Sequence, residues 1–350
     1  MAQWEPAKRK LGFYIIMNVA NCLKKPLTVE EQIKRLKAHN MVIQDETMAA
    51  EILGRVNYYR FTGYALQFRV SENNSDFVQR TTFNEVYDIY RFDEELRGLL
   101  RVYIEKLEVY FRTIIAYLFS LAKCLLPPHD QHYDESNFFN KKGYQQLRDH
   151  FKRDRDYYRD SLVLKHHAKN YNDKLPLWVI VELVSFSDLS KLYSCMFYSE
   201  KDRIAKAAGV GYNTLGNNLH CLSVLRNKCA HAARLYNTEL NPPVSMNKET
   251  NRRNPQIRGN SLFAYLWMLS KRLNKVDRKK FVDSLIILIE SYNGRIDLRL
   301  IGFPSDWKKI IKNFRNFHCQ QNVKASSGRL FHFAFGRCLK WTVSRKKQKP

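Results

Sequence analysis

The sequence predicts an all-α protein, and three observations support the prediction. Apolar residues recur at steps of three and four along several long stretches, which is the period of an amphipathic helix. Ser, Thr, Asp and Asn stand where such stretches begin, as helix N-caps do. Few segments alternate between polar and apolar residues, so a substantial β-sheet is not expected.

Two short helices are expected near the N-terminus. Thr28-Val29-Glu30-Glu31 has the form of a capping box and predicts a helix that runs through about His39. Asp45 is expected to cap a second helix that ends near Arg55. Residues 57–60, which include two adjacent tyrosines, are interpreted as an aromatic bend.

The longest periodic segment runs from residue 83 to 122 and predicts one long helix with a single buried stripe. Pro127-Pro128 then ends any helix. The residues of the stripe are Leu96, Leu99, Leu100, Tyr103, Leu107, Phe111, Ile114 and Leu118.

Several further helices are expected in the second half of the chain. A charged segment at 141–174 comes before Pro176, and a strongly apolar helix follows it. Ser199 and Asn213 are expected N-caps. The helices expected here run over 177–197, from Ser199, from Asn213 to about His231, over 261–274, over 277–292, and from Pro304.

The 350 residues are enough for a sizeable core. We expect one helical domain at 24–315, with a bundle core at about 83–300 and an N-terminal helical extension. Residues 1–23 are expected to form an N-terminal extension, and residues 316–350 are expected to form a mobile basic tail.

The charge of the chain favours a polyanionic partner. The sequence has 59 Lys and Arg against 34 Asp and Glu, a net charge of +25. Eight of these basic residues and no acid lie at 316–350, which leaves +17 for the rest. The basic surface therefore extends over the folded part and indicates nucleic acid or an acidic membrane surface.

The cysteine pattern and the hydropathy predict a cytoplasmic protein. The seven Cys are scattered, with no C-x-x-C pair, which is typical of reduced thiols rather than a disulfide framework. No apolar run reaches the ~18 residues that a membrane span needs. The membrane-surface alternative depends on a short amphipathic pattern at 330–335.

The segment that can carry chemistry lies at 225–237. On a helix, Asn227 and His231 share one face, and the long side chains of Arg226 and Arg234 reach the same region. An imidazole exchanges protons near neutral pH, and a guanidinium stabilises the charge of a phosphorane-like transition state. This pattern fits metal-free phosphodiester cleavage, although the spacing alone favours a capping or structural histidine.

Motifs in the same order along residues 24–315 resemble the abortive-infection proteins of the AbiD/AbiF type, which belong to the HEPN superfamily. The motifs are Lys25-Pro26-Leu27 with Glu31-Gln32; Asn57-Tyr58-Tyr59-Arg60 with Gly63-Tyr64; Tyr90-Arg91-Phe92-Asp93 with Leu96-Arg97; Glu105 through Arg112-Thr113; Pro176-Leu177-Trp178 with Glu182 and Ser185-Phe186; the 226–237 segment; and Gly302-Phe303-Pro304 with Trp307.

The resemblance implies a HEPN-type helical bundle and an R-x4-H ribonuclease motif at Arg226 and His231. It implies cleavage without a metal, in which the 2′-OH of RNA attacks the adjacent phosphate and leaves a 2′,3′-cyclic phosphate. It also implies a homodimer, a role in phage defence as a toxin-like effector, and for some relatives a small structured non-coding RNA as partner. The chain departs from the family pattern with Ala232, where many relatives have a second His, and with Tyr236, where Trp is common.

Other polar residues have competing interpretations. Arg112 follows Glu108 by four residues, so it is expected in an internal ion pair, or alternatively in the RNA cleft. Tyr58, Tyr59 and Arg60 can stack on unpaired bases or hold the N-terminal helices together.

Three further candidates are interpreted as structural or as surface. Trp178, Glu182 and Phe186 are expected to pack around the motif helix. A zinc site near His220, Cys221, Cys229 and His231 is disfavoured, because the two Cys lie about 12 Å apart along a helix. The carboxylates at 154–160 alternate with arginines and are interpreted as a salt-bridged surface.

The leading hypothesis is a metal-independent endoribonuclease without cofactors. His231 would be the general acid/base, Arg226 would stabilise the transition state, and Asn227 would orient the phosphate or the imidazole. Arg234 would contact phosphate, with Arg112 and residues 58–60 as further RNA contacts. The alternative is a non-catalytic RNA-binding protein of the same fold, bound to a small non-coding RNA.

Overall fold

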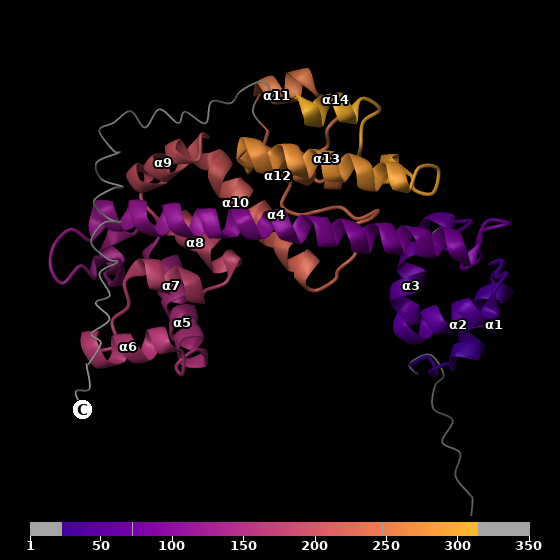
Figure 1. The fold of residues 1–350 in the computed structure, drawn as a ribbon, viewed down its shortest axis with the longest axis horizontal. Coiled ribbons are helices and arrows are strands. Elements are labelled where there is room, and N and C mark those ends of the chain that lie inside the picture. Colours follow the sequence, from indigo (N-terminus) through magenta and orange to yellow (C-terminus); the bar gives the residue numbers. More distant parts are fainter. Residues whose placement is uncertain (1–22, 72, 247, 314–350) are drawn as a thin grey trace, which may run out of the picture. The chain divides into compact units, whose positions relative to one another are not determined.

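The computed structural model describes residues 23–71, 73–246 and 248–313 (Figure 1). Fourteen α-helices and no β-strand occur in these ranges, which confirms the all-α prediction. The extended pairings there are two isolated bridges, Val42 with Thr82 and Arg69 with Phe77. The basic tail expected at 316–350 and, apart from Leu23, the segment expected at 1–23 lie outside the described residues.

The chain divides into two compact units, residues 1–87 and 88–350. The first unit contains α1 (Val29–Ala38), α2 (Glu46–Arg55) and α3 (Tyr58–Tyr64), and the long helix α4 (Phe83–Lys123) begins at its end. The second unit contains the rest of α4, then α5 (Lys141–Tyr157), α6 (Leu162–Tyr171), α7 (Leu177–Leu183), α8 (Phe186–Cys195), α9 (Tyr198–Ala207), α10 (Tyr212–Ala230), α11 (Lys248–Arg253), α12 (Leu262–Arg272), α13 (Lys275–Ser291) and α14 (Trp307–Lys312).

The first unit has the expected helix starts. Thr28 and Glu31 form the predicted capping box, each side chain accepting the other residue's backbone N–H. Asp45 caps α2 by accepting the Met48 N–H at 2.9 Å. The interpretation of residues 57–60 as a bend is wrong, because the Asn57 side chain accepts the Tyr59 N–H and starts α3 instead.

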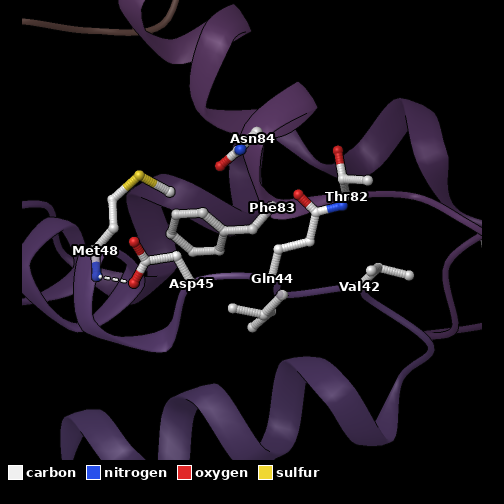
Figure 2. Close-up of a pocket in the computed structure, with 8 residues that line it drawn as sticks. Val42, Gln44, Asp45, Met48, Thr82, Phe83 and Asn84 are labelled. Carbon is white, nitrogen blue, oxygen red and sulfur yellow. Dashed lines mark hydrogen bonds between the residues drawn. The ribbon is translucent and has the colours of Figure 1, made fainter.

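A hollow of about 10 Å³ opens beside the start of α2 in this unit (Figure 2). Phe83, Gln44 and Val42 line it, and the Asp45–Met48 capping bond closes one side. A single water molecule needs about that volume, so the hollow is a packing gap rather than a ligand site.

Helix α4 is the longest helix described and buries the predicted stripe over most of its length. Leu96, Leu100, Tyr103, Leu107 and Phe111 are buried, as expected, whereas Leu99 is half-buried. Beyond Phe111 the buried positions are Ile115 and Phe119, not Ile114 and Leu118, which are half-buried. A continued pattern of alternating three- and four-residue steps drifts around an α-helix, and successive four-residue steps correct the drift.

Two helix boundaries differ from the sequence prediction. The apolar stretch expected as one helix at 177–197 is two helices, because Ser185 caps α8 by accepting the Asp188 N–H at 3.1 Å. Helices α9 and α10 begin after Phe197 and Gly211 rather than at Ser199 and Asn213. No side chain caps the start of α9 or of α10, so the positions of Ser199 and Asn213 did not indicate where these helices begin.

Helix α10 lies at the centre of the second unit. It packs against α8, α9 and α12, while α12 packs on α13 and α13 on α14. On the other side of α8, α5 packs against α7 and α8 (Figure 1). In the described part of the chain, no helix is both long and apolar enough to cross a membrane.

The buried stripe of α4 should dominate the stability of the second unit. Leu100→Ala is expected to lower the free energy of unfolding by about 2–5 kcal/mol, because Leu100 is fully buried and its removal leaves a cavity. Val102→Ala, on the exposed side of the same helix, is the matched control and should change it by less than about 0.5 kcal/mol. Urea unfolding measures both; equal effects would contradict the assigned orientation of α4.

Candidate functional site

The motif residues lie at the C-terminal end of α10, which is held firmly along its length. Leu215, Leu219, Leu222 and Leu225 follow each other at steps of three and four and are fully buried. They face the neighbouring helices α8, α9 and α12. Because these contacts fix the axis of α10, its last turn presents side chains from a rigid support.

His231 is the C-cap residue of α10, close to where the sequence predicted the helix to end. Its backbone N–H donates to the Asn227 carbonyl at 2.9 Å. The next residue, Ala232, has a φ of 50°, a left-handed conformation that terminates the helix. The His231 side chain is exposed, so the imidazole is accessible to a substrate.

Buried Asp93 on α4 fixes the chain that follows His231. Its carboxylate pairs with Arg97 at 2.5 Å, one helical turn away. It also accepts the backbone N–H groups of Leu235 at 3.1 Å and Tyr236 at 2.9 Å. Arg97 in turn donates to the Ala233 carbonyl at 3.5 Å. One fully buried ion pair therefore binds the backbone of residues 233–236 to α4.

Tyr236 adds a second attachment for the same segment. Its hydroxyl donates to the Asp297 carbonyl at 3.0 Å and accepts the Asp297 N–H at 2.9 Å. Its ring packs edge-on against Phe92, with centroids 6.2 Å apart. A phenol can both donate and accept, whereas the Trp common among relatives only donates. Tyr236 therefore both donates a hydrogen bond to the Asp297 backbone and accepts one from it, which a Trp cannot do.

Arg226 is held by a carboxylate that it shares with Arg112. The Nε atom of Arg226 lies 3.4 Å from one Glu108 oxygen, and Arg112 contacts the other oxygen at 2.5 Å. The side chain of Arg226 is 42% exposed, whereas those of Glu108 and Arg112 are 11% and 10% exposed. Two guanidinium groups share one carboxylate, so the cluster retains a net positive charge that is accessible at Arg226.

Arg112 occupies the internal ion pair that the sequence predicted. Its Nη1 atom is buried and has no hydrogen-bond partner among the described residues. The side chain is too enclosed to meet a substrate as this structure stands, so its expected RNA contact stays a prediction. Through Glu108, however, Arg112 influences where Arg226 stands.

The other two motif residues differ in their surroundings. Asn227 is half-buried, and its amide donates to the Ser187 hydroxyl of α8 at 3.2 Å. This bond fixes Asn227 to α8 rather than to His231. Arg234 is half-buried in the segment that Asp93 holds. The roles expected for Asn227 and Arg234 toward RNA stay predictions.

Tyr58, Tyr59 and Arg60 belong to the first unit, at the start of α3. Tyr59 is 86% exposed, and its ring is available for stacking. Tyr58 is half-buried, and burial raises the pKa of its hydroxyl despite the nearby Arg35. The stacking and the structural interpretations therefore fit different members of this trio.

The packing role expected for Trp178, Glu182 and Phe186 holds for one of the three. Phe186 is buried on α8, which packs against α10. Glu182 is exposed, and Trp178 is 42% exposed and stacked on Tyr117 of α4 at 5.8 Å. The expectation is wrong for these two because α7 ends at Leu183, and α8 rather than α7 packs against α10.

The two thiols next to the motif are poor metal ligands. Burial raises the pKa of Cys221 to about 11 and that of Cys229 to about 12. Both therefore stay protonated near neutral pH, whereas metal binding requires the thiolate. In the described ranges, no group of three His, Cys, Asp or Glu side chains is arranged to hold a metal ion.

Sequence reasoning missed the residues that hold the motif. Asp93 and Arg97 lie in a motif of the family resemblance, and their spacing of four is a signal for a helix ion pair. Nothing in the sequence indicated that the same carboxylate reaches residues 235 and 236. Glu108 was expected to pair with Arg112, but its contact with Arg226 joins two helices and has no sequence signal.

The sequence model of the Abi-like protein family matches residues 51–237, more than half of the chain. The chain belongs to the Abi-like protein family. The matched range includes Asp93, Glu108 and the motif through Asn237. Comparison with curated proteins and with solved structures found no match. For this Abi-like protein the family indicates a role in abortive infection, and it confirms the resemblance to abortive-infection proteins.

Asp93 should be essential for the stability of this Abi-like protein. Asp93→Asn removes the charge that balances buried Arg97 and is expected to cost about 3–5 kcal/mol. Glu94→Gln makes the same chemical change on the neighbouring, exposed residue and should cost less than about 0.5 kcal/mol. Denaturant unfolding compares the two variants, and a small effect at Asp93 would refute its anchoring role.

Proposed function

We propose that this Abi-like protein is a metal-independent endoribonuclease of abortive infection that acts in the cytoplasm. The observation that carries the proposal is the end of α10, where an exposed imidazole at the C-cap and a half-exposed guanidinium five residues before it stand on a rigidly held helix. The HEPN superfamily, to which the sequence motifs point, supplies the expected reaction.

In the proposed reaction His231 removes the proton from a ribose 2′-OH. The 2′ oxygen attacks the adjacent phosphorus, the P–O5′ bond breaks, and the 5′ oxygen takes up a proton. Arg226 offsets the extra negative charge that develops on the phosphate oxygens. The products are a 2′,3′-cyclic phosphate and a free 5′-OH.

The chemistry of the site supports this reaction over a metal-assisted one. Glu108 is the carboxylate beside Arg226, and two guanidinium groups already neutralise it. A cation gains little from such a carboxylate, whereas a phosphate gains from the excess positive charge. The net charge of +25 favours the approach of RNA in the same way.

The alternative is a non-catalytic protein that holds RNA, with a small structured non-coding RNA as its partner. Ala232 favours this alternative, because many relatives have a second His at that position. The hydrogen bond from the Asn227 amide to Ser187 also favours this alternative, because it fixes Asn227 to α8 rather than to His231.

Replacement of the motif histidine separates the two functions. His231→Ala should lower the rate of RNA cleavage at least about 100-fold, because the proton acceptor is lost, while RNA binding persists. His220→Ala is the matched control, since His220 is an exposed histidine on the same helix. Cleavage is measured in EDTA with identification of the product ends. Unchanged cleavage by His231→Ala would refute the catalytic assignment, and RNA binding without cleavage by the wild type would favour the alternative.

A homodimer is part of the proposal. In-line displacement needs a base on one side of the phosphorus and an acid on the other, and one imidazole does not reach both. An exposed apolar stripe lies on α4, on the side away from Glu108, and it consists of Val109, Tyr110, Tyr117 and Leu121. A second copy that packs on this stripe would bury it.

A charge on this stripe should separate the copies. Val109→Glu is expected to shift the protein from dimer to monomer in sedimentation equilibrium, because it leaves a carboxylate in an apolar interface. Ile287→Glu, on α13, introduces the same charge at another exposed apolar position and should leave the dimer intact. A monomeric wild type, or dimers of both variants, would contradict this interface.

A further inference from the structure

A second pocket lies near the opposite end of α10 from the motif. Its volume is about 100 Å³, and it opens between the first turns of α10, the end of α12, residues 244–246 and Thr250 of α11. Asn218 in this pocket precedes Arg226 by eight residues, which corresponds to about 12 Å along the helix. The pocket is therefore separate from the motif but shares its helix.

The first feature that points to a ligand is the start of α10. Gly211 is the N-cap of this 19-residue helix, and no side chain caps it. The first backbone N–H groups of a helix have no intrahelical acceptor and favour an anion. A Cβ atom at Gly211 would meet nothing within 4 Å, so the backbone at this helix start is open to the pocket.

The second feature is the side chain of Asn218. It is only 2% exposed and lines the pocket. Among the described residues, no group forms a hydrogen bond with its amide. Its amide can therefore form hydrogen bonds with a ligand in the pocket.

The third feature is the positive charge on the α12 side. Lys271 and Arg272 line the pocket. The Nζ atom of Lys271 donates to the Asn313 carbonyl at 3.2 Å, and Arg278 donates to the same oxygen at 3.2 Å. Burial, followed by the charges of Arg278 and Arg272, lowers the pKa of Lys271 to about 8. Crowded cations of this kind are stabilised by an anion placed among them.

An apolar wall, formed by α12 and Val244, contains an aromatic ring. Val244, Met268 and Trp267 line it, and Lys271 lies over the Trp267 ring at 5.6 Å from its centroid. Such a wall suits a nucleobase, which stacks on an aromatic face. The volume admits a phosphate group, with the remainder of a ligand toward the open side.

We propose that this pocket binds the phosphate of a nucleotide. The phosphate lies between the start of α10 and the Lys271–Arg272 pair, and the Asn218 amide donates to the ligand. The nucleotide is either free or the 5′-terminal residue of an RNA, since both present a phosphate monoester beside a base.

Binding of AMP to the full-length protein tests the proposal by isothermal titration calorimetry. Asn218→Asp and Lys271→Gln should each weaken binding at least tenfold, the first by placing a carboxylate beside the phosphate and the second by removing a cation. Lys280→Gln, an exposed lysine of α13, is the matched control and should change the affinity less than twofold. Lys271→Gln keeps the test valid if Asn218→Asp does not fold.

The affinity should also depend on pH in a defined direction. Lys271 is protonated below its pKa of about 8 and attracts the phosphate, so the affinity for AMP should fall as the pH rises from 7 to 9. Arg272 and Arg278 stay charged throughout this range. In Lys271→Gln this loss of affinity should disappear.

A second arm identifies the source of the phosphate. A 5′-phosphorylated RNA hexamer is compared with its 5′-hydroxyl counterpart. Tighter binding of the phosphorylated hexamer, with the difference lost in Lys271→Gln, identifies an RNA end. Binding of AMP alone identifies a free nucleotide. The proposal is overturned if neither AMP nor the 5′-phosphate is recognised. It is also overturned if both pocket variants bind like wild type, or if Arg226→Gln abolishes AMP binding and the pocket variants do not.

Discussion

The buried carboxylate of Asp93 is the constraint on which the motif depends. It neutralises Arg97 and holds two backbone N–H groups of the segment after His231. Ala232 adopts a left-handed conformation that costs an alanine about 1–2 kcal/mol. Such a conformation persists only where the surroundings fix it, and here the fixed helix α10 lies before it and the Asp93-bound segment after it. The direction of the chain at His231 is therefore set from both sides.

The long helix α4 also supplies the charged groups that surround Arg226. One α4 carboxylate, Glu108, serves two arginines, of which Arg112 is enclosed and Arg226 is partly open. The enclosed Glu108–Arg112 pair orients Arg226. In the proposed reaction, the partly exposed guanidinium of Arg226 supplies the positive charge that meets the phosphate. The conformational freedom of Arg226 is reduced before any substrate arrives, which lowers the entropy lost on binding.

Helix α10 connects two sites with the same chemical preference. Its start is an uncapped helix end beside Lys271 and Arg272, and its end carries Arg226 and His231. The buried leucines between them make the helix a rigid link rather than a flexible one.

The sequence alone determined the helical class, the stripe of α4 as far as Phe111, the capped starts of α1 and α2, and the family. These depend on local periodicity, on caps within a few residues, and on motif order. It did not determine the start of α10 at Gly211, since that helix begins without a side-chain cap. Nor did it reveal that Asp93 binds residues 235 and 236, or that Glu108 joins Arg112 to Arg226. These contacts join residues more than 100 positions apart, and only the packing of α10 beside α4 brings their charges within bonding distance.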